Sequence, residues 1–209
     1  MATVTQNKAS QAAISPAIAL EMLKEGNQRF IEKRMQDRDL HVQVQGTTGG
    51  QYPFAVVLGC IDSRVPVEVV FDQGIGDIFT ARVAGNFVNE DILGSIEYGC
   101  KVAGSKLVVV LGHTSCGAIK GACDDVRLGN VTALISKLKP SVKAVYTPEG
   151  IDRSSDNKDF VNRVVHKNVE MTIENMKKDS PVLNEMLENG EIDIVGGVYD
   201  LKTGKVNFM

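Results

Sequence analysis

Three short runs rich in apolar and β-branched residues recur along the first half of the chain. They are FAVVLG at Phe54–Gly59, DIFTARV at Asp77–Val83 and KLVVVLG at Lys106–Gly112. The first and third are apolar almost throughout, which is typical of strands covered on both faces in a parallel sheet. Helical patterns separate the runs, around residues 66–72 and 91–103. The pattern therefore predicts a β-α-β-α-β order.

The flanking segments add helices on both sides. A helix is predicted over residues 15–34, because Ser15 can cap its N-terminus and Pro16 suits its first position. We expect residues 1–14 to be a loose arm and the polar stretch 37–50 to be a connector.

Beyond Cys116 the pattern is mainly helical to about Asn189, with a polar loop between residues 146 and 157. The segment IDIVGGVYDL is then predicted to be the last strand, followed by a Thr-Gly turn. The predicted fold is α/β, with a central, mostly parallel sheet of four to five strands flanked by helices and an N-terminal helical arm. We expect residues 1–209 to form a single domain, since this length is ordinary for one.

Composition narrows the class of protein. The formal net charge is −3, and 43% of the residues are apolar. A concentrated basic surface is therefore not expected, and nucleic acid is not an expected partner. No apolar run reaches the ~18 residues of a membrane span, and no secretory signal is visible. We expect a cytoplasmic protein with no membrane partner.

Two of the predicted strands end directly on metal-ligand residues. Cys60 follows the first strand, His113 follows the third, and Cys116 comes three residues after His113. Parallel strands place their carboxyl ends at one edge of the sheet, where open α/β sheets build ligand sites. The sequence therefore predicts that these three side chains bind one ion.

A set of two cysteines and one histidine favours zinc, because magnesium and calcium prefer oxygen ligands. Catalytic zinc sites have three protein ligands and keep one position for water, whereas structural sites are closed by four. Zinc can lower the pKa of that water from ~15.7 to ~7, which makes hydroxide available near neutrality. The expected cofactor is Zn²⁺ in a catalytic site.

Asp62 and Arg64 follow the first ligand by two and four residues. A carboxylate at this place can accept a hydrogen bond from the metal's hydroxide, and Arg64 can hold it by a bidentate pair. The same carboxylate could instead swing onto the metal and displace the water. The sequence leaves both roles open.

The segment CxDSRV at Cys60–Val65, together with HxxCG at His113–Gly117, resembles the beta-class carbonic anhydrases. The resemblance implies that Cys60, His113 and Cys116 hold zinc, with Asp62 and Arg64 as a catalytic dyad. It implies that the backbone N–H of Gly117 binds the substrate oxygen. The implied reaction is the reversible hydration of CO₂ to bicarbonate and a proton by a metal-bound hydroxide, in a dimer or dimer of dimers.

A plant-like subtype of this family is indicated by three further positions. Gln51 and Tyr98 match its substrate-site glutamine and tyrosine, and Phe79 matches its pocket phenylalanine. Ala84 departs from the valine of the plant enzymes, which affects the expected size of the CO₂ pocket. The resemblance thus implies that these four residues bind substrate.

Gln51 also carries an inference about assembly. A strand of ~3.3 Å per residue separates it from Cys60, so the two ends lie on the order of 20 Å apart. If Gln51 contacts substrate, it does so at the metal of a neighbouring subunit. The active site is therefore expected at a dimer interface.

Two alternatives use the same residues differently. One is a hydrolase of CS₂ or COS on the same zinc site, and the other is a non-catalytic zinc or redox-sensing protein with a closed four-ligand site. Cys100 and Cys123 have no matching histidines for a metal site, and we expect them to be buried or unused thiols. We expect surface or packing roles for His41 and His166.

Overall fold

The structure is a computed structural model that describes residues 5–209. Sixteen elements follow one another along these residues. They are α1 (Lys8–Ala12), α2 (Pro16–Ile31), α3 (Leu40–Gly46), β1 (Ala55–Gly59), α4 (Val67–Val70), β2 (Ile78–Arg82), α5 (Glu90–Glu97), the π-helix η1 (Tyr98–Val102), β3 (Leu107–His113), α6 (Gly117–Cys123), α7 (Gly129–Ser136), α8 (Lys139–Ala144), α9 (Lys158–Asp179), α10 (Pro181–Glu188), β4 (Asp193–Tyr199) and β5 (Val206–Phe208).

The strands form one five-stranded sheet in the order β2-β1-β3-β4-β5. The first four strands pair in parallel, and only β5 is antiparallel to its neighbour. The predicted fold class, an α/β protein with a mostly parallel sheet, is confirmed. Strand β2 lies at one edge of the sheet and β5 at the other.

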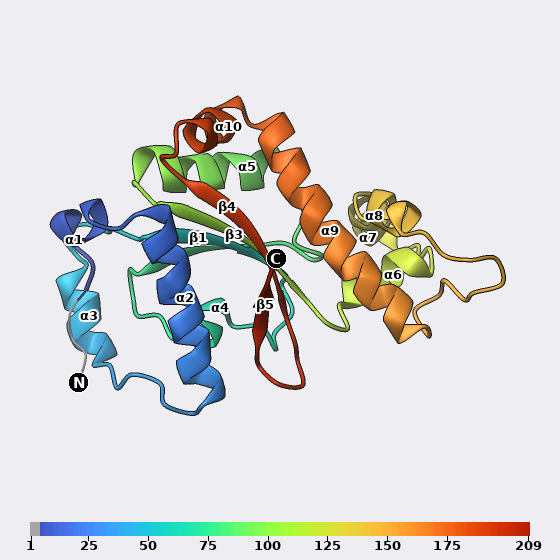
Figure 1. Ribbon diagram of the computed structural model, residues 1–209, viewed down its shortest axis with the longest axis horizontal. Helices are drawn as coiled ribbons and strands as arrows, with labels where there is room; N and C mark the ends of the chain where they lie inside the picture. The colour runs from blue at the N-terminus through green and yellow to red at the C-terminus, as the bar shows by residue number, and fades with distance from the viewer. Residues whose placement is uncertain (1–4) are drawn as a thin grey trace.

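Helices cover both faces of the sheet (Figure 1). On one face, Ala55 and Val57 of β1 pack with Leu23 of α2 and Val70 of α4. On the other face, Val56 and Leu58 pack against the cluster formed by α5, α6, α9 and α10. Successive residues of β1 therefore enter opposite cores, which explains why this strand is apolar at every position.

The N-terminal segment is more ordered than predicted. Helix α2 begins after Ser15, whose side chain accepts a hydrogen bond from the N–H of Ile18, but it ends at Ile31. The expectation of a loose arm over residues 1–14 is wrong for residues 7–12, which form a cap and helix α1. Its buried Gln11 donates hydrogen bonds to the carbonyls of Pro53 and Ala103, 2.8 Å each. Residues 1–4 of the predicted arm lie outside the described residues.

The predicted connector over residues 37–50 contains a helix, α3, and this expectation was also wrong. Asp39 caps the helix by accepting from the N–H groups of His41 and Val42. Its buried residue is Gln43, whose side chain accepts from the N–H of Ile75. Because α3 buries a polar residue and exposes its apolar ones, its sequence lacks the amphipathic pattern that would have predicted a helix.

Smaller differences concern element ends. The helix predicted around residues 66–72 is the short α4. The helix predicted over residues 91–103 ends at Glu97 and continues as the π-helix η1. After the predicted Thr-Gly turn the chain adds the three-residue strand β5, too short and mixed to predict. Within residues 5–209, no helix combines the length and apolar content needed to cross a membrane.

Gly26 of α2 offers a test of how the N-terminal helix packs. A Cβ at this position would lie 1.8 Å from the carbonyl oxygen of Phe71, at the end of α4. Because backbone cannot yield as a side chain can, we expect Gly26→Ala to lower the free energy of unfolding by about 2 kcal/mol or more. Urea denaturation at fixed protein concentration measures this.

Lys24→Ala, on the exposed side of the same helix, is the control, and its effect should stay within about 0.5 kcal/mol. Equal stability of the two variants would show that α2 does not approach α4 this closely.

Candidate metal centre

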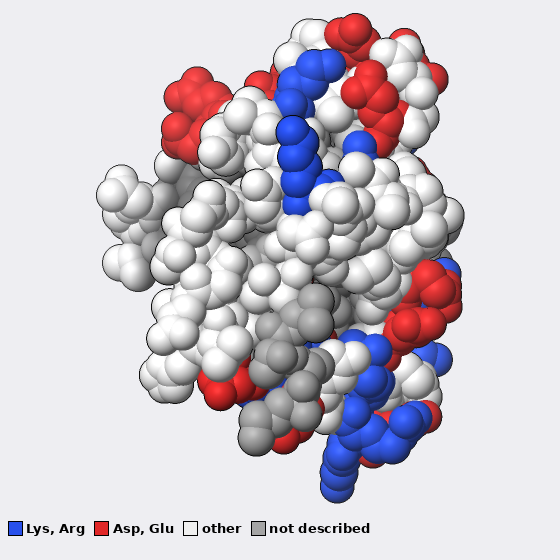
Figure 2. Space-filling model, turned by 90° about the vertical axis from the view of Figure 1, so that its left-hand side faces the viewer, with Lys and Arg blue, Asp and Glu red and all other residues white. Residues whose placement is uncertain are grey.

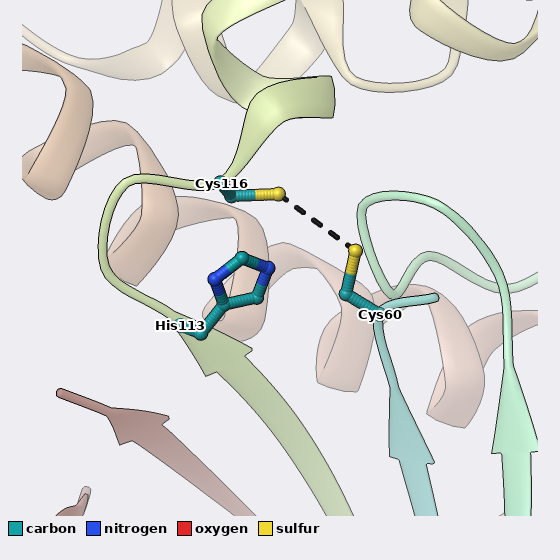
Figure 3. Close-up of side chains that lie close together, drawn as sticks. All are labelled: Cys60, His113 and Cys116. Atoms are coloured by element: carbon teal, nitrogen blue, oxygen red, sulfur yellow. Dashed lines mark hydrogen bonds between the residues drawn. The ribbon is translucent and has the colours of Figure 1, made fainter. Parts of the chain in front are cut away.

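Cys60, His113 and Cys116 come together at the carboxyl end of the parallel sheet. Cys60 follows β1, His113 is the last residue of β3, and Cys116 directly precedes α6 (Figure 3). Their ligand atoms all lie within 4.8 Å of one another, and all three side chains are buried. The sequence-based prediction that these residues gather at one point is confirmed.

A tight turn brings Cys116 back towards His113. Ser115, between them, has a φ of 57°, in the left-handed region that few non-glycine residues adopt. Thr114 anchors the turn, because its N–H donates to the carbonyl of Tyr199 and its hydroxyl accepts from the N–H of Leu201. The strained Ser115 is thus held in place through Thr114, which is bonded to the end of β4 and to the turn after it.

The arrangement of the donor atoms fits a zinc ion. The two sulfurs lie 3.9 Å apart, and two thiolates about 2.3 Å from one tetrahedral ion would be about 3.8 Å apart. His113 Nδ1 lies 3.0 Å from the carbonyl oxygen of Thr114, which can only accept, so Nδ1 carries the proton. The lone pair of Nε2 then points into the cluster, and this buried atom has no hydrogen-bond partner among residues 5–209.

Backbone N–H groups surround both sulfurs. The N–H of Gly85 donates to Cys60 Sγ at 3.3 Å, and the first turn of α6 offers the N–H groups of Ala118 and Ile119 to Cys116. The pKa of Cys60 lies well below its usual value, chiefly because the Cys116 thiol donates to it. The pKa of Cys116 is raised by that same hydrogen bond and by burial. Before metal binds, the two sulfurs therefore share one proton through this hydrogen bond.

Asp62 and Arg64 form the predicted bidentate pair beside the cluster. Arg64 donates from Nε to Oδ1 at 2.9 Å and from its terminal nitrogen to Oδ2 at 2.7 Å. These hydrogen bonds hold the pKa of Asp62 well below its usual range. Oδ2 lies 3.8 Å from His113 Nε2, so the ionised carboxylate borders the point where the three ligands converge.

Arg82 and Gly85 are site residues that the sequence analysis missed. Arg82, the last residue of β2, donates to the carbonyls of Cys60 at 2.8 Å and Asp62 at 2.7 Å and so braces the loop between them. Its place at the end of a parallel strand was the signal that could have found it. Gly85 lies in a turn that no sequence pattern identified.

The other predicted site residues fall into two groups. Gly117 adjoins Cys116 at the start of α6 with open space beside its Cα, and Ala84 precedes Gly85, so both lie next to the ligands.

Phe79 and Tyr98 pack on each other, with ring centroids 6.4 Å apart, in a groove of about 740 Å³ along the sheet edge. Gln51 is exposed before β1, at the opposite end of that strand from Cys60. The structure brings neither this residue nor the aromatic pair to the ligands of the same chain.

Comparison with known proteins agrees with this geometry. A family model described as carbonic anhydrase matches residues 55–206. Carbonic anhydrase 2 of Mycobacterium tuberculosis is 38% identical over 197 residues, which cover 91% of each chain. The carbonic anhydrase of Mycolicibacterium smegmatis is 35% identical over 198 residues, 92% of each chain.

Solved structures give the same result. A beta-carbonic anhydrase of Sordaria macrospora, described as tetrameric, superposes with a TM-score of 0.69 at 25% identity, covering 79% of this chain and 85% of that one. The Coccomyxa beta-carbonic anhydrase in complex with acetazolamide has a TM-score of 0.69 at 27% identity, covering 79% of this chain and 75% of that one. The chain therefore belongs to the beta class of the carbonic anhydrase family, zinc-dependent lyases that interconvert CO₂ and bicarbonate.

Proposed function

We propose that this chain hydrates CO₂ at a site built from the Cys60, His113 and Cys116 cluster, with Asp62 as the residue that orients the attacking water. The observation that carries the proposal is the buried Nε2 of His113, which has no hydrogen-bond partner in the described part of the chain and lies within 4.8 Å of both sulfurs and 3.8 Å from the Asp62 carboxylate. When bound there, zinc acts as a Lewis acid that lowers the pKa of a water ligand.

Asp62 is suited to orient water because it is held in a single ionised form. Both of its oxygens accept hydrogen bonds from Arg64, and its side chain is only 14% exposed. An ionised carboxylate can only accept, so the water beside it must donate one hydrogen to Asp62 and direct a lone pair elsewhere. A fixed acceptor at this place favours attack of that lone pair on CO₂.

Gly117 and Ala84 are proposed to shape the place where CO₂ lies. A Cβ on Gly117 would meet no atom within 4 Å, so space remains beside the first N–H groups of α6. An N–H at the start of a helix has no partner within that helix, and it is free to donate to a substrate oxygen. The small side chain of Ala84, the residue before Gly85, is proposed to leave further room near Cys60.

We further propose that the active site is completed by a second copy of the chain, as in a dimer or dimer of dimers. Within residues 5–209, strand β2 is a sheet edge with no further strand beside it, and Tyr98, which packs on Phe79 of this strand, is 51% exposed. A second groove of about 600 Å³ runs past Leu40, Val69 and Ile75. Figure 2, which views the side of α1 and α3, shows a broad area without charged side chains to the left of centre and a column of Lys and Arg that descends from the top to the middle.

Exposed apolar surface of this extent supports contact with another protein surface. A partner seated on this edge would cover Phe79 and Tyr98. It could also bring its own Gln51 towards the metal cluster, in the manner of the plant-like subtype.

The thiols of Cys60 and Cys116 must remain reduced to hold zinc, and all four cysteines are free. Their reduced state supports a place in the cytoplasm.

The role of Asp62 is tested by Asp62→Asn. We expect kcat/KM for CO₂ hydration to fall at least about 100-fold, because the amide can donate and no longer fixes the water in one orientation. Zinc content should stay at one ion per chain. Stopped-flow CO₂ hydration and metal analysis of the same sample measure both quantities.

Asp125→Asn is the matched control, since Asp125 forms an exposed pair with Arg127 at the same spacing in sequence. It should leave kcat/KM unchanged. An Asp62→Asn enzyme as fast as wild type, or one that has lost its zinc, would contradict an orienting role.

The shared active site is tested by complementation between two inactive variants. We expect Gln51→Ala and Asp62→Asn homodimers each to be weak. A heterodimer isolated with two different affinity tags should recover about half of the wild-type activity. One of its two sites then combines an intact Asp62 with the intact Gln51 of the other subunit.

If Gln51 served the metal of its own chain, each site of the heterodimer would carry one defect and no activity would return. A fully active Gln51→Ala homodimer, or an active monomer by light scattering, would likewise contradict the proposal.

A further inference from the structure

The hydrogen bond from the Gly85 N–H to Cys60 Sγ comes from a loop that holds no metal ligand. The two atoms lie 3.3 Å apart, and both residues are buried. A hydrogen bond of this kind withdraws charge from a thiolate and tunes its strength as a ligand. What holds Gly85 in place therefore influences the metal centre.

Gly85 is fixed by both its backbone conformation and its surroundings. Its φ is 84°, in the region that favours glycine, and a Cβ here would lie 2.6 Å from Cδ1 of Leu138. The turn can therefore be occupied only by glycine without strain. This turn directs the N–H of Gly85 towards Cys60 and the carbonyl of Gly85 away from Cys60.

That carbonyl is held by Asn168, which comes from the distant helix α9. Asn168 Nδ2 donates to Gly85 O at 2.8 Å, and the Ser141 hydroxyl donates to Asn168 Oδ1 at 3.2 Å. Both polar side chains are 3% exposed. Buried polar groups of this kind are costly unless each bond is made, so the arrangement is well determined.

Helix α9 is itself locked onto the strand that carries His113. Val165 and Val169 belong to the same buried cluster as Val108 and Val110 of β3. The core thus fixes Asn168 relative to the end of β3, while Asn168 fixes the turn that touches Cys60. The side-chain amide of Asn168 therefore connects Cys60, which follows β1, with His113, which ends β3.

We propose that Asn168 is a positioning residue of the metal centre, acting through Gly85 on the sulfur of Cys60. By holding the Gly85 turn it keeps the N–H···S hydrogen bond short, and so strengthens zinc binding and lowers the electron donation of that thiolate. This inference rests on the proposed role of Cys60 as a zinc ligand.

Asn168→Leu tests it, since leucine has a similar volume and no donor. We expect zinc affinity, measured by competition with a chromogenic chelator, to fall about 10-fold. In the cobalt-substituted protein, the thiolate-to-cobalt charge-transfer band should move to longer wavelength, because a sulfur that has lost a hydrogen bond gives up electron density more easily.

Ser141→Ala is the matched control. It removes the other hydrogen bond of Asn168 but leaves the one to Gly85, so both readouts should stay at wild-type values. Wild-type values for Asn168→Leu, or an equal change in Ser141→Ala, would overturn the proposal. Should Asn168→Leu fail to fold, Asn168→Ser, which cannot reach Gly85, is measured in the same way.

A second measurement needs no variant. In protein loaded with ¹¹³Cd, a hydrogen bond to a metal-bound sulfur transmits scalar coupling from the metal to the amide proton. We expect such coupling at the Gly85 amide, and its absence in a sample with one cadmium per chain would overturn the inference alone. A sample that binds no stoichiometric metal would instead count against the proposed function.

Discussion

The parallel pairing of β1 with β3 is the constraint on which the metal centre depends. Their register sets Leu58 beside Val110 and Gly59 beside Leu111, so the two strands finish at nearly the same level. Cys60 comes directly after β1, and His113 is the last residue of β3, two residues past Leu111, so both stand where the strands end. A slip of one residue would send the side chains of one strand to the opposite face, and the ligands would no longer share a point. The two apolar cores above and below the sheet make such a slip costly, because both faces of β1 and β3 are fully buried.

Charge is the second constraint, because the site gathers two sulfurs and a carboxylate with little solvent around them. Each negative group has its own donors. The Gly85 N–H serves Cys60, the start of α6 serves Cys116, and Arg64 serves Asp62. Two thiolates formally cancel the charge of a zinc ion, so hydrogen bonds to the sulfurs determine how much positive character the ion keeps. The surrounding protein therefore shapes the chemistry of the ion as well as its position.

The sequence identified most of the site because its key residues stand directly after strong strand patterns. Cys60 and His113 follow apolar runs that are typical of buried strands, and Cys116 lies three residues after His113. Asp62 and Arg64 are close enough in sequence for their pairing to be predicted. Gly85 and Asn168 could not be found this way, because their role arises from a contact between residues 83 positions apart. Helices α1 and α3 were missed because each is anchored by a buried glutamine that bonds to residues far away in sequence. Helix α3 in addition exposes its apolar residues, so it lacks an amphipathic pattern.

X-ray absorption at the zinc edge of the freshly purified protein tests the central claim most directly. The account predicts one zinc per chain with two sulfur ligands at about 2.3 Å and one imidazole nitrogen at about 2.0 Å, completed by one oxygen. Substituting Cys60 with alanine should remove one of the two sulfurs or the metal itself. A shell of four sulfurs, a shell of nitrogen and oxygen only, or protein without stoichiometric zinc would contradict it.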